Sequence, residues 1–351
     1  MTLQERVNQG LKGEFKGLNN GFKDINEYIF GVQKHCYTLI GGMSGTYKTT
    51  LLDYIFLNAI QDAQAKGKKL DVFYYSFEID KLTKQCNWLS QLAWKNYNVI
   101  IPPKKIKGLG DNRLSNDEQE IINTLIPKVE KLFESINWVF DAMNPTGIYN
   151  DIFKFCAQKG TFTYEDYIDE RVDKATGKKI EVKKQRIKSF EWKEDQYLLL
   201  GIDHLYLAKK ERSFSTKENM DKISEFLVIL RNLFGVSSFV VQQFNQGLNA
   251  VDRQKFKGID LSPSQNDFKD TTNPYQDADV VLGIINPFKL DIYEYQGYDT
   301  TVFRDKMISL KIIKNRLERD NISKALLCHP QSGRFEELPK PQLIQYNNYK
   351  T

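Results

Sequence analysis

Residues 41–50 read GGMSGTYKTT, and they follow the short apolar run 36–40 (CYTLI), which is typical of a strand. A helical pattern follows, so this glycine-rich stretch is expected to join a strand to a helix. In such a turn the glycines let backbone N–H groups point inward, and the helix N-terminus adds positive potential, which favours bound phosphate. The predicted loop residues are Gly42, Met43, Ser44, Gly45, Thr46, Tyr47, Lys48, Thr49 and Thr50.

Lys48 and Thr49 stand where a phosphate-binding loop requires them. In the pattern G-x-x-x-x-G-K-[ST], the lysine reaches the β- and γ-phosphates, and the hydroxyl residue binds Mg²⁺. Gly42, Lys48 and Thr49 fit this pattern, whereas Tyr47 replaces the glycine that precedes the lysine. Because the flanking elements also agree, the sequence predicts a site for a nucleotide with Mg²⁺.

Three other strand ends carry polar residues suited to such a site. Asp203 ends the apolar run YLLLGID and is predicted to bind Mg²⁺, although an acid at a strand end is often only a helix cap. Glu78 follows LDVFYYSF and is predicted to orient or deprotonate water, the alternative being an exposed residue at a helix start. Gln243 ends FVVQQ and is predicted to hydrogen-bond the γ-phosphate, with Gln242 an equally polar neighbour.

The wider chain alternates strands and helices, which predicts an α/β fold with a mainly parallel sheet flanked by helices. Past residue 275 the strand-like runs 279–285, 307–313 and 322–328 predict extra C-terminal antiparallel strands, and the tail from Pro330 is expected to be extended. Earlier strands are expected at 36–40, 70–77, 138–140, 197–203 and 237–242, and helices at 49–65, 81–97, 115–134, 148–157 and 217–234. A capping box opens the third of these helices.

Residues 162–192 interrupt this alternation. The turn signal KATGK lies between two runs of strand character, which predicts a β-hairpin insertion. Residues 169–188 hold eight Lys or Arg and four Asp or Glu, so this segment is net positive. It is either a solvated hairpin or a basic arm that touches nucleic acid or a neighbouring subunit.

Composition limits the class of protein. Of 351 residues, 41% are hydrophobic and 27% charged, which supports a buried core, and the net charge of +5 permits a nucleic-acid partner without requiring one. No apolar run reaches about 18 residues and the start has no apolar signal region, so neither a spanning helix nor secretion is expected. Four separate cysteines suit small core positions in a reducing cytoplasm and not a zinc cluster.

The order of these motifs resembles the RecA-like ATPase domain of DnaB-type replicative helicases, the hexameric superfamily 4 enzymes. The resemblance runs from about Gly17 to about Glu337. It predicts an arm at 1–16, an ATPase domain at 17–338 that includes the hairpin, and a tail at 339–351. The matching stretches are GLNNGFKDINEYIFGVQKHCYTLIGGMSGTYKTT, YYSFEI, LLLGIDHLYLA, FVVQQFNQGL, NDFKDTTNPYQDADVVLGI and LKIIKNRLERD.

The resemblance implies a mechanism as well as a fold. ATP with Mg²⁺ would lie between subunits of a homo-oligomeric, hexameric ring, with Glu78 as the catalytic carboxylate and Asp203 at the Mg²⁺. The next subunit would supply Arg316 as an arginine finger together with Lys314. Single-stranded or forked DNA would contact Lys269, Asp270 and Thr272. The implied partners also include a primase or a loader, and the implied location is the cytoplasm, that of a bacterial host for a phage-encoded protein.

Several departures from the family point to a divergent, viral member. The family's helical N-terminal domain would be absent, Thr272 replaces a glycine of the DNA loop, and Tyr47 crowds the phosphate loop. From local sequence alone, Lys314 and Arg316 also fit a solvated basic turn. Two other functions share the same motifs. One is a RecA- or KaiC-like ATPase that assembles without unwinding DNA, and the other is a nucleotide-gated loader or accessory factor, which Tyr47 favours.

Overall fold

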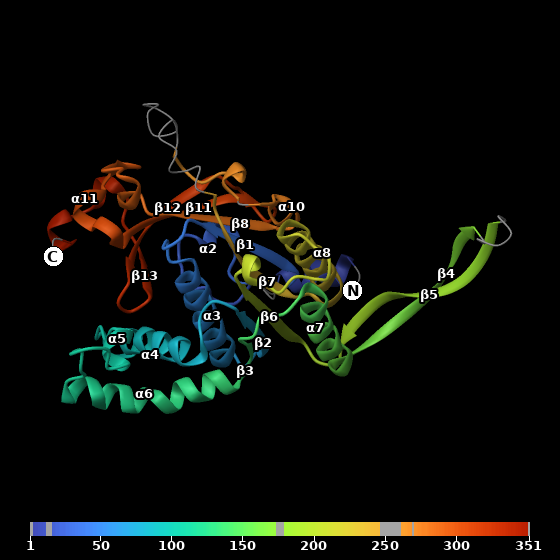
Figure 1. Cartoon of the computed structure of the whole chain (residues 1–351), viewed down its shortest axis with the longest axis horizontal. Coiled ribbons are helices and arrows are strands. Elements are labelled where there is room, and N and C mark those ends of the chain that lie inside the picture. The colour runs from blue at the N-terminus through green and yellow to red at the C-terminus, as the bar shows by residue number, and fades with distance from the viewer. Residues whose placement is uncertain (1–2, 12–15, 173–178, 246–260, 269, 350–351) are drawn as a thin grey trace.

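A computed structural model describes residues 3–11, 16–172, 179–245, 261–268 and 270–349. A nine-stranded sheet in the order β13-β12-β11-β8-β1-β7-β6-β2-β3 organises the chain (Figure 1). Its parallel part consists of β3 (Ile136–Val139), β2 (Lys69–Ser76), β6 (Gln196–Asp203), β7 (Ser237–Gln243), β1 (Cys36–Gly42) and β8 (Val280–Ile285). The α/β class with a mainly parallel sheet is therefore confirmed.

The central strands β1, β6 and β8 are buried along their whole length because helices cover both faces of the sheet. Every residue of β1 is buried, and its side chains alternate between two cores, with Ile40 in one and Leu39 in the other. The first face carries α3 (Lys48–Ala65), α4 (Lys81–Tyr97) and α6 (Asn116–Glu134), and the second carries α7 (Pro145–Lys159), α8 (Thr216–Phe234) and α10 (Asn273–Asp277). The predicted capping box at α6 is present, with Ser115 and Glu118 bonded reciprocally.

Two of the predicted C-terminal runs, 307–313 and 322–328, extend the sheet in antiparallel fashion beside β8, whereas the run 279–285 forms β8 itself, which is parallel to β1. The antiparallel strands are β11 (Met307–Asn315), β12 (Ile322–His329) and β13 (Arg334–Glu337). The expectation of an extended tail from Pro330 holds for residues 334–337, which form β13 and pair with β12, but not for 341–343 and 346–349, which form short 3-10 helices. The carboxylate of Glu337 accepts hydrogen bonds from the backbone N–H groups of Lys23, Asp24 and Ile25, so the tail also anchors the start of the fold.

The predicted hairpin consists of β4 (Gly160–Val172) and β5 (Lys179–Trp192), and Figure 1 shows it projecting from the body as a two-stranded arm. At its root Trp192 Nε1 donates to the carbonyl of Phe234, 2.9 Å away. Farther out, acids of β4 pair with bases of β5: Glu165 with Arg186, and Asp169 with Lys184. Two basic side chains of the hairpin are thus paired with carboxylates of the same hairpin.

Short elements complete the described chain. They are α1 (Leu3–Leu11), α2 (Asn26–Ile29), α5 (Pro103–Ile106), η1 (Leu205–Leu207), η3 (Gln265–Asp267), η4 (Phe288–Leu290), β9 (Glu294–Tyr295), β10 (Tyr298–Asp299), α11 (Thr300–Phe303), η5 (Arg304–Lys306), η6 (Pro341–Leu343) and η7 (Tyr346–Tyr349). All four cysteines are free and buried, as expected of small core residues. None of the described helices combines the length and the apolar character needed to cross a membrane.

Candidate nucleotide site

The predicted phosphate-binding loop lies between β1 and α3, at the carboxyl edge of the sheet, where ligands of open α/β sheets bind. Gly42 is required by close packing, since a Cβ there would lie 2.6 Å from Thr46 Oγ1 and 3.1 Å from the carbonyl of Ile284. Gly45 is required by its backbone, with φ at +71°. The Thr46 hydroxyl donates to the carbonyl of Met43 at 2.8 Å and closes the loop on itself.

Tyr47 occupies the helix-start position with left-handed backbone angles, φ 65° and ψ 26°. An L-residue in this region bears a cost of about 1–2 kcal/mol, which explains why the pattern prefers glycine there. The ring packs against the core of the first face, and Lys289 Nζ lies 5.4 Å from its centroid. Lys289 Nζ also donates to the carbonyl of Gly45 at 2.9 Å. Packing around the tyrosine thus supports a loop conformation that its backbone disfavours.

Lys48 turns its side chain into the loop. Its Nζ donates to the carbonyl of Met43 at 2.6 Å. Burial lowers the pKa of the Lys48 ammonium to about 8, while the negative charges of Asp203 and Glu78 act to raise it. A bound phosphate would supply the counter-charge that this half-buried ammonium lacks.

Thr49 and Asp203 meet although 154 residues separate them in the chain. The Thr49 hydroxyl donates to Asp203 Oδ1 at 2.9 Å. Asp203 is fully buried at the end of β6, and β7 lies between β6 and β1. A hydroxyl and a carboxylate held together beside a phosphate loop are oxygen ligands of the kind Mg²⁺ takes alongside phosphate oxygens. The described residues include no cluster of three or more His, Cys, Asp or Glu that could hold a metal ion.

Glu78 lies in the turn between β2 and α4, at the same edge of the sheet. Ser76 pairs with Asp203 in register, which places Glu78 just beyond the end of β6. Its side chain is 53% exposed, and its Oε2 lies 3.9 Å from His204 Nε2. An exposed carboxylate at this edge is accessible to water and to a nucleotide, and His204 is a neighbour that sequence reasoning did not identify.

Gln243 pairs in register with Gly42, so it ends β7 directly beside the phosphate loop. The backbone therefore separates it from Gln242, which points into the core and donates from Nε2 to the carbonyl of Thr271 at 3.0 Å. Of the two amides, the half-buried Gln243 lies at the open edge. The position of Gln243 at the open edge is the one that suits the predicted contact with the γ-phosphate.

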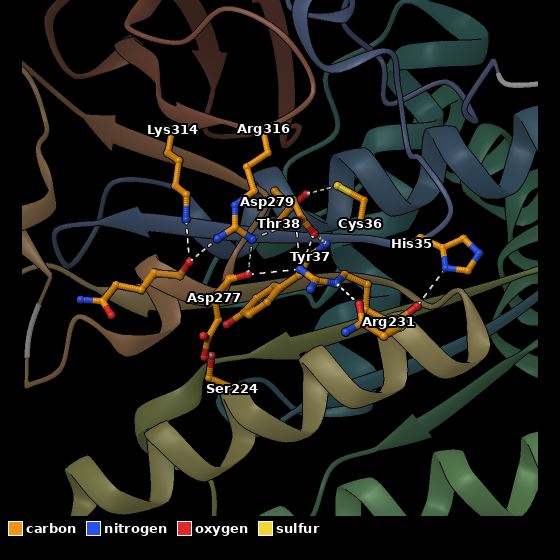
Figure 2. A network of polar contacts seen from close by, with 12 residues as sticks. His35, Cys36, Tyr37, Thr38, Ser224, Arg231, Asp277, Asp279, Lys314 and Arg316 are labelled. Carbon is orange, nitrogen blue, oxygen red and sulfur yellow. Dashed lines mark hydrogen bonds and ion pairs between the residues drawn. The ribbon is translucent and has the colours of Figure 1, made fainter. Parts of the chain in front are cut away.

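Lys314 and Arg316 lie in a different polar network, shown in Figure 2. Lys314 Nζ donates to the carbonyls of Tyr275 and Gln276 at 2.9 and 2.7 Å. Arg316 pairs with Asp279 at 3.3 Å, and Asp279 also pairs with Arg231 at 2.8 Å. Burial first, and then the charge of Arg316, lowers the pKa of Lys314 to about 8.

This network lies at the opposite end of the strands from the phosphate loop. Gly42 is level with Ile284 of β8, whereas the N–H of Arg316 donates to the carbonyl of Asp279, ahead of that strand. Five residues of strand separate the two levels, a span of about 16 Å. The structure brings Lys48, Thr49, Asp203, Glu78 and Gln243 to one edge, and it places Lys314 and Arg316 away from them.

The predicted DNA loop is described in part. Lys269 lies outside the described residues. Asp270 is exposed and has φ of 68°, and Thr272 precedes α10 at the N-cap position without a side-chain capping hydrogen bond. Thr271 between them is buried, and its hydroxyl donates to Asp221 at 2.6 Å. The loop is therefore fastened through Thr271 to α8 and, through Gln242, to the strand that ends beside the phosphate loop.

Comparisons with known proteins identify relatives in sequence and in fold. The chain is 24% identical over 330 residues to a replicative DNA helicase DnaB of Helicobacter pylori, covering 92% of this chain and 54% of the relative, and 23% identical to the DnaB of a second strain. No family model matches. The chain spans about half the length of the curated relatives it matches.

Two solved structures are similar in fold. A DnaB-like replicative helicase, described with its interactions with primase, has a TM-score of 0.68 and 14% identity, covering 96% of this chain and 68% of that one. The second is a single ATPase domain, with a TM-score of 0.67 and 14% identity, covering 96% of this chain and 99% of that one. These matches confirm the RecA-like fold and the resemblance to DnaB-type replicative helicases.

Proposed function

We propose that the chain is the motor of a DnaB-type replicative helicase, which binds ATP with Mg²⁺ and hydrolyses it to move along single-stranded DNA. One observation carries the proposal. The Thr49 hydroxyl and the Asp203 carboxylate are hydrogen-bonded at 2.9 Å beside a strand-to-helix loop that carries a half-buried lysine. A hydroxyl, a carboxylate and a lysine in this relation are what ATP with Mg²⁺ requires.

The chain's own residues have separate tasks in this reaction. Loop N–H groups and Lys48 hold the β- and γ-phosphates, and Gln243 hydrogen-bonds the γ-phosphate. Glu78 orients the water that attacks the γ-phosphorus, so that the bond to the β,γ-bridging oxygen breaks and ADP leaves. When bound, Mg²⁺ would neutralise charge on the phosphate oxygens, held by Thr49 and Asp203. The exposure of Glu78 leaves room for that water.

The proposed site is completed by a second copy of the chain in a ring, for which six copies are proposed. Arg316 lies at the far end of the sheet from its own phosphate loop, and its side chain is 49% exposed. In a head-to-tail ring this end of one subunit would face the loop of the next, so Arg316 and Lys314 would act in trans on the γ-phosphate. Asp270 and Thr272, with Lys269, would contact the DNA strand in the pore, and a primase or loader would bind the assembled ring.

A direct experiment compares three rates in the wild-type protein and in Lys48→Ala. They are ATP hydrolysis alone, ATP hydrolysis with single-stranded DNA, and strand displacement on a forked duplex. The proposal expects hydrolysis stimulated by DNA, displacement that requires ATP, and loss of both in a folded Lys48→Ala protein. Stimulated hydrolysis without displacement would instead indicate an assembling ATPase of RecA or KaiC type, and nucleotide binding without turnover would indicate an accessory factor.

A further inference from the structure

A fully buried lysine lies behind Asp203, outside the residues assigned above. Lys84 of α4 has a side chain that is 0% exposed. Its Nζ lies 2.8 Å from Asp53 Oδ1, 2.9 Å from the Tyr74 hydroxyl and 3.5 Å from Asp203 Oδ2. An ammonium has three N–H donors, and a buried charge is costly unless it is paired. Asp53 and Tyr74 accept hydrogen bonds from two of these donors, and Asp203 is a further ion-pair partner of the ammonium.

The contact with Asp203 accounts for the second oxygen of that carboxylate. Oδ1 accepts the hydrogen bond from Thr49, as described above. Within the described part of the chain, Oδ2 is buried and accepts no hydrogen bond, and Lys84 is its ion-pair partner. Asp203 is therefore held between a hydroxyl on the side of the proposed site and an ammonium behind it.

The cluster also joins four elements around the phosphate loop. Asp53 lies one helical turn after Thr49 on α3, Tyr74 is on β2, and Lys84 is on α4, which begins just after Glu78. The Tyr74 hydroxyl donates to Asp53 at 2.6 Å, so Asp53 and Tyr74 form a rigid support for the ammonium. A lysine held on two sides has little freedom to move away from the third contact, Asp203 Oδ2.

We propose that Lys84 is a positioning residue, whose ammonium holds Oδ2 of Asp203 so that Oδ1 and the Thr49 hydroxyl are presented together to Mg²⁺ bound with a nucleotide. This inference rests on the proposed function. The simpler alternative is that Lys84 only neutralises Asp53 inside the core. The two roles differ in one respect, because only the first makes the effect of Mg²⁺ on nucleotide affinity depend on Lys84.

The expected effect follows from what each group holds. The loop backbone and Lys48 bind the phosphates without Lys84, so the affinity for ADP without Mg²⁺ stays close to that of the wild type. Without Lys84 the Asp203 carboxylate is free to turn, and the Mg²⁺ ligands are no longer preset. Loss of a group that orients a metal ligand typically lowers metal affinity about 10–100-fold. The Mg²⁺-dependent gain in ADP affinity is expected to fall by about 10-fold or more.

The test uses the double variant Lys84→Met with Asp53→Asn, which removes both members of the pair and leaves no unpaired charge at position 53. The matched control is Asp53→Asn alone, in which Lys84 and Asp203 still face each other. Affinity for a fluorescent ADP is measured with and without Mg²⁺, Mn²⁺ binding is followed by electron paramagnetic resonance, and thermal unfolding reports the fold. We expect the increase in ADP affinity caused by Mg²⁺ to be lost in the double variant. In the control it should stay within about threefold of the wild-type value.

The other outcomes are distinguishable. Two results would overturn the role of Lys84 and leave the proposed function in place. One is a folded double variant in which Mg²⁺ increases ADP affinity as in the wild type. The other is an equal loss of this increase in the double variant and in the control. A wild-type protein that binds no nucleotide would overturn the proposed function, and this inference with it. If the double variant does not fold, the ¹⁵Nζ resonance of Lys84 in the wild type decides: it should shift when Mg²⁺ joins bound ADP, and no shift would exclude the contact.

Discussion

The two halves of the proposed ATP site differ in how far one chain completes them. At the carboxyl edge of the sheet, Asp203 is 0% exposed and is hydrogen-bonded to Thr49 across the strand ends. At the opposite end, the Arg316 side chain is 49% exposed and is paired with Asp279 of its own chain. The first half is preorganised by burial within one molecule. The second half is fixed in position but faces outward.

This difference has a consequence for assembly. Groups that are buried and mutually bonded keep their geometry in the isolated chain. The half-exposed Arg316 is instead held by Asp279 and by the carbonyls of Gln276 and Asp277, and it has to leave them to reach a second chain. The phosphate-loop half should therefore bind nucleotide in a monomer. The contribution of Arg316 should appear only when a second chain brings its own phosphate loop to this end of the sheet.

The largest expected effect is at Arg316. Arg316→Ala should bind nucleotide as the wild type does and should lower ATP turnover by about 10³–10⁵-fold, because an arginine finger stabilises charge in the transition state. Arg319→Ala, an exposed change in the same turn, is the control and should retain turnover. Both rates are measured with saturating single-stranded DNA, after the oligomeric state has been measured by light scattering.

Mixing variants tests whether Arg316 acts in trans. Arg316→Ala and Lys48→Ala should each be nearly inactive, and together they should form composite sites that join an intact loop to an intact arginine, with partial recovery of turnover. Mixed assembly is verified separately by co-purification of differently tagged chains. A monomeric protein with full DNA-stimulated turnover that Arg316→Ala does not change would remove the distinction between the two halves.

A second variant tests the half that one chain completes. Glu78→Gln should leave ATP affinity close to the wild-type value and lower turnover by at least about 10²-fold, because the amide cannot take a proton from the attacking water. Binding is measured by equilibrium titration and turnover by phosphate release. Equal losses of binding and turnover would show that Glu78 maintains structure and does not act on water.

Tyr47 tests whether the phosphate loop stores backbone strain. At an ordinary helix position glycine is less stable than alanine by about 0.5–1 kcal/mol. At position 47, with φ of 65°, the order should reverse, and Tyr47→Gly should be more stable than Tyr47→Ala by about 1 kcal/mol in urea unfolding. Both variants lose the same ring contacts, so their difference reports the backbone. Ala65→Gly, at an exposed position of α3, is the control and should show the ordinary order.

The smallest expected effect is a change in the pKa of Lys314. Its pKa of about 8 is low because of burial, with Arg316 the next cause. Arg316→Ala should therefore raise the pKa of Lys314 toward its ordinary value, so that the ammonium stays charged to higher pH, while Arg319→Ala should leave it unchanged. The titration is followed by NMR of the ¹⁵N-labelled lysine side chain. If the pKa of Lys314 does not change in Arg316→Ala, the charge of Arg316 does not influence Lys314.

Much of the fold and part of the site were predictable because they depend on local pattern. The sequence around Gly42 and Lys48 specifies a strand, a turn and a helix in one continuous stretch. Apolar runs that end in Asp203 and Gln243 predict parallel strands whose ends meet at one edge. The helix bounded by Ser115 follows from a reciprocal capping pair within four residues. The pairing of residues 334–337 with β12 was not predicted, because it is a tertiary contact between segments whose local sequence shows only polar and proline-containing character.

The sequence alone determined most of the order of strands and helices, the predicted phosphate loop and the polar residues at neighbouring strand ends. It could do so because backbone propensities and apolar periodicity act over short distances. Only the tertiary structure decided that Thr49 bonds Asp203 and that Lys84 lies between Asp53 and Asp203. It also decided that Arg316 lies at the end of the sheet opposite its own loop. These relations follow from strand order and register, which bring together or separate residues far apart in the chain, and no local pattern encodes them.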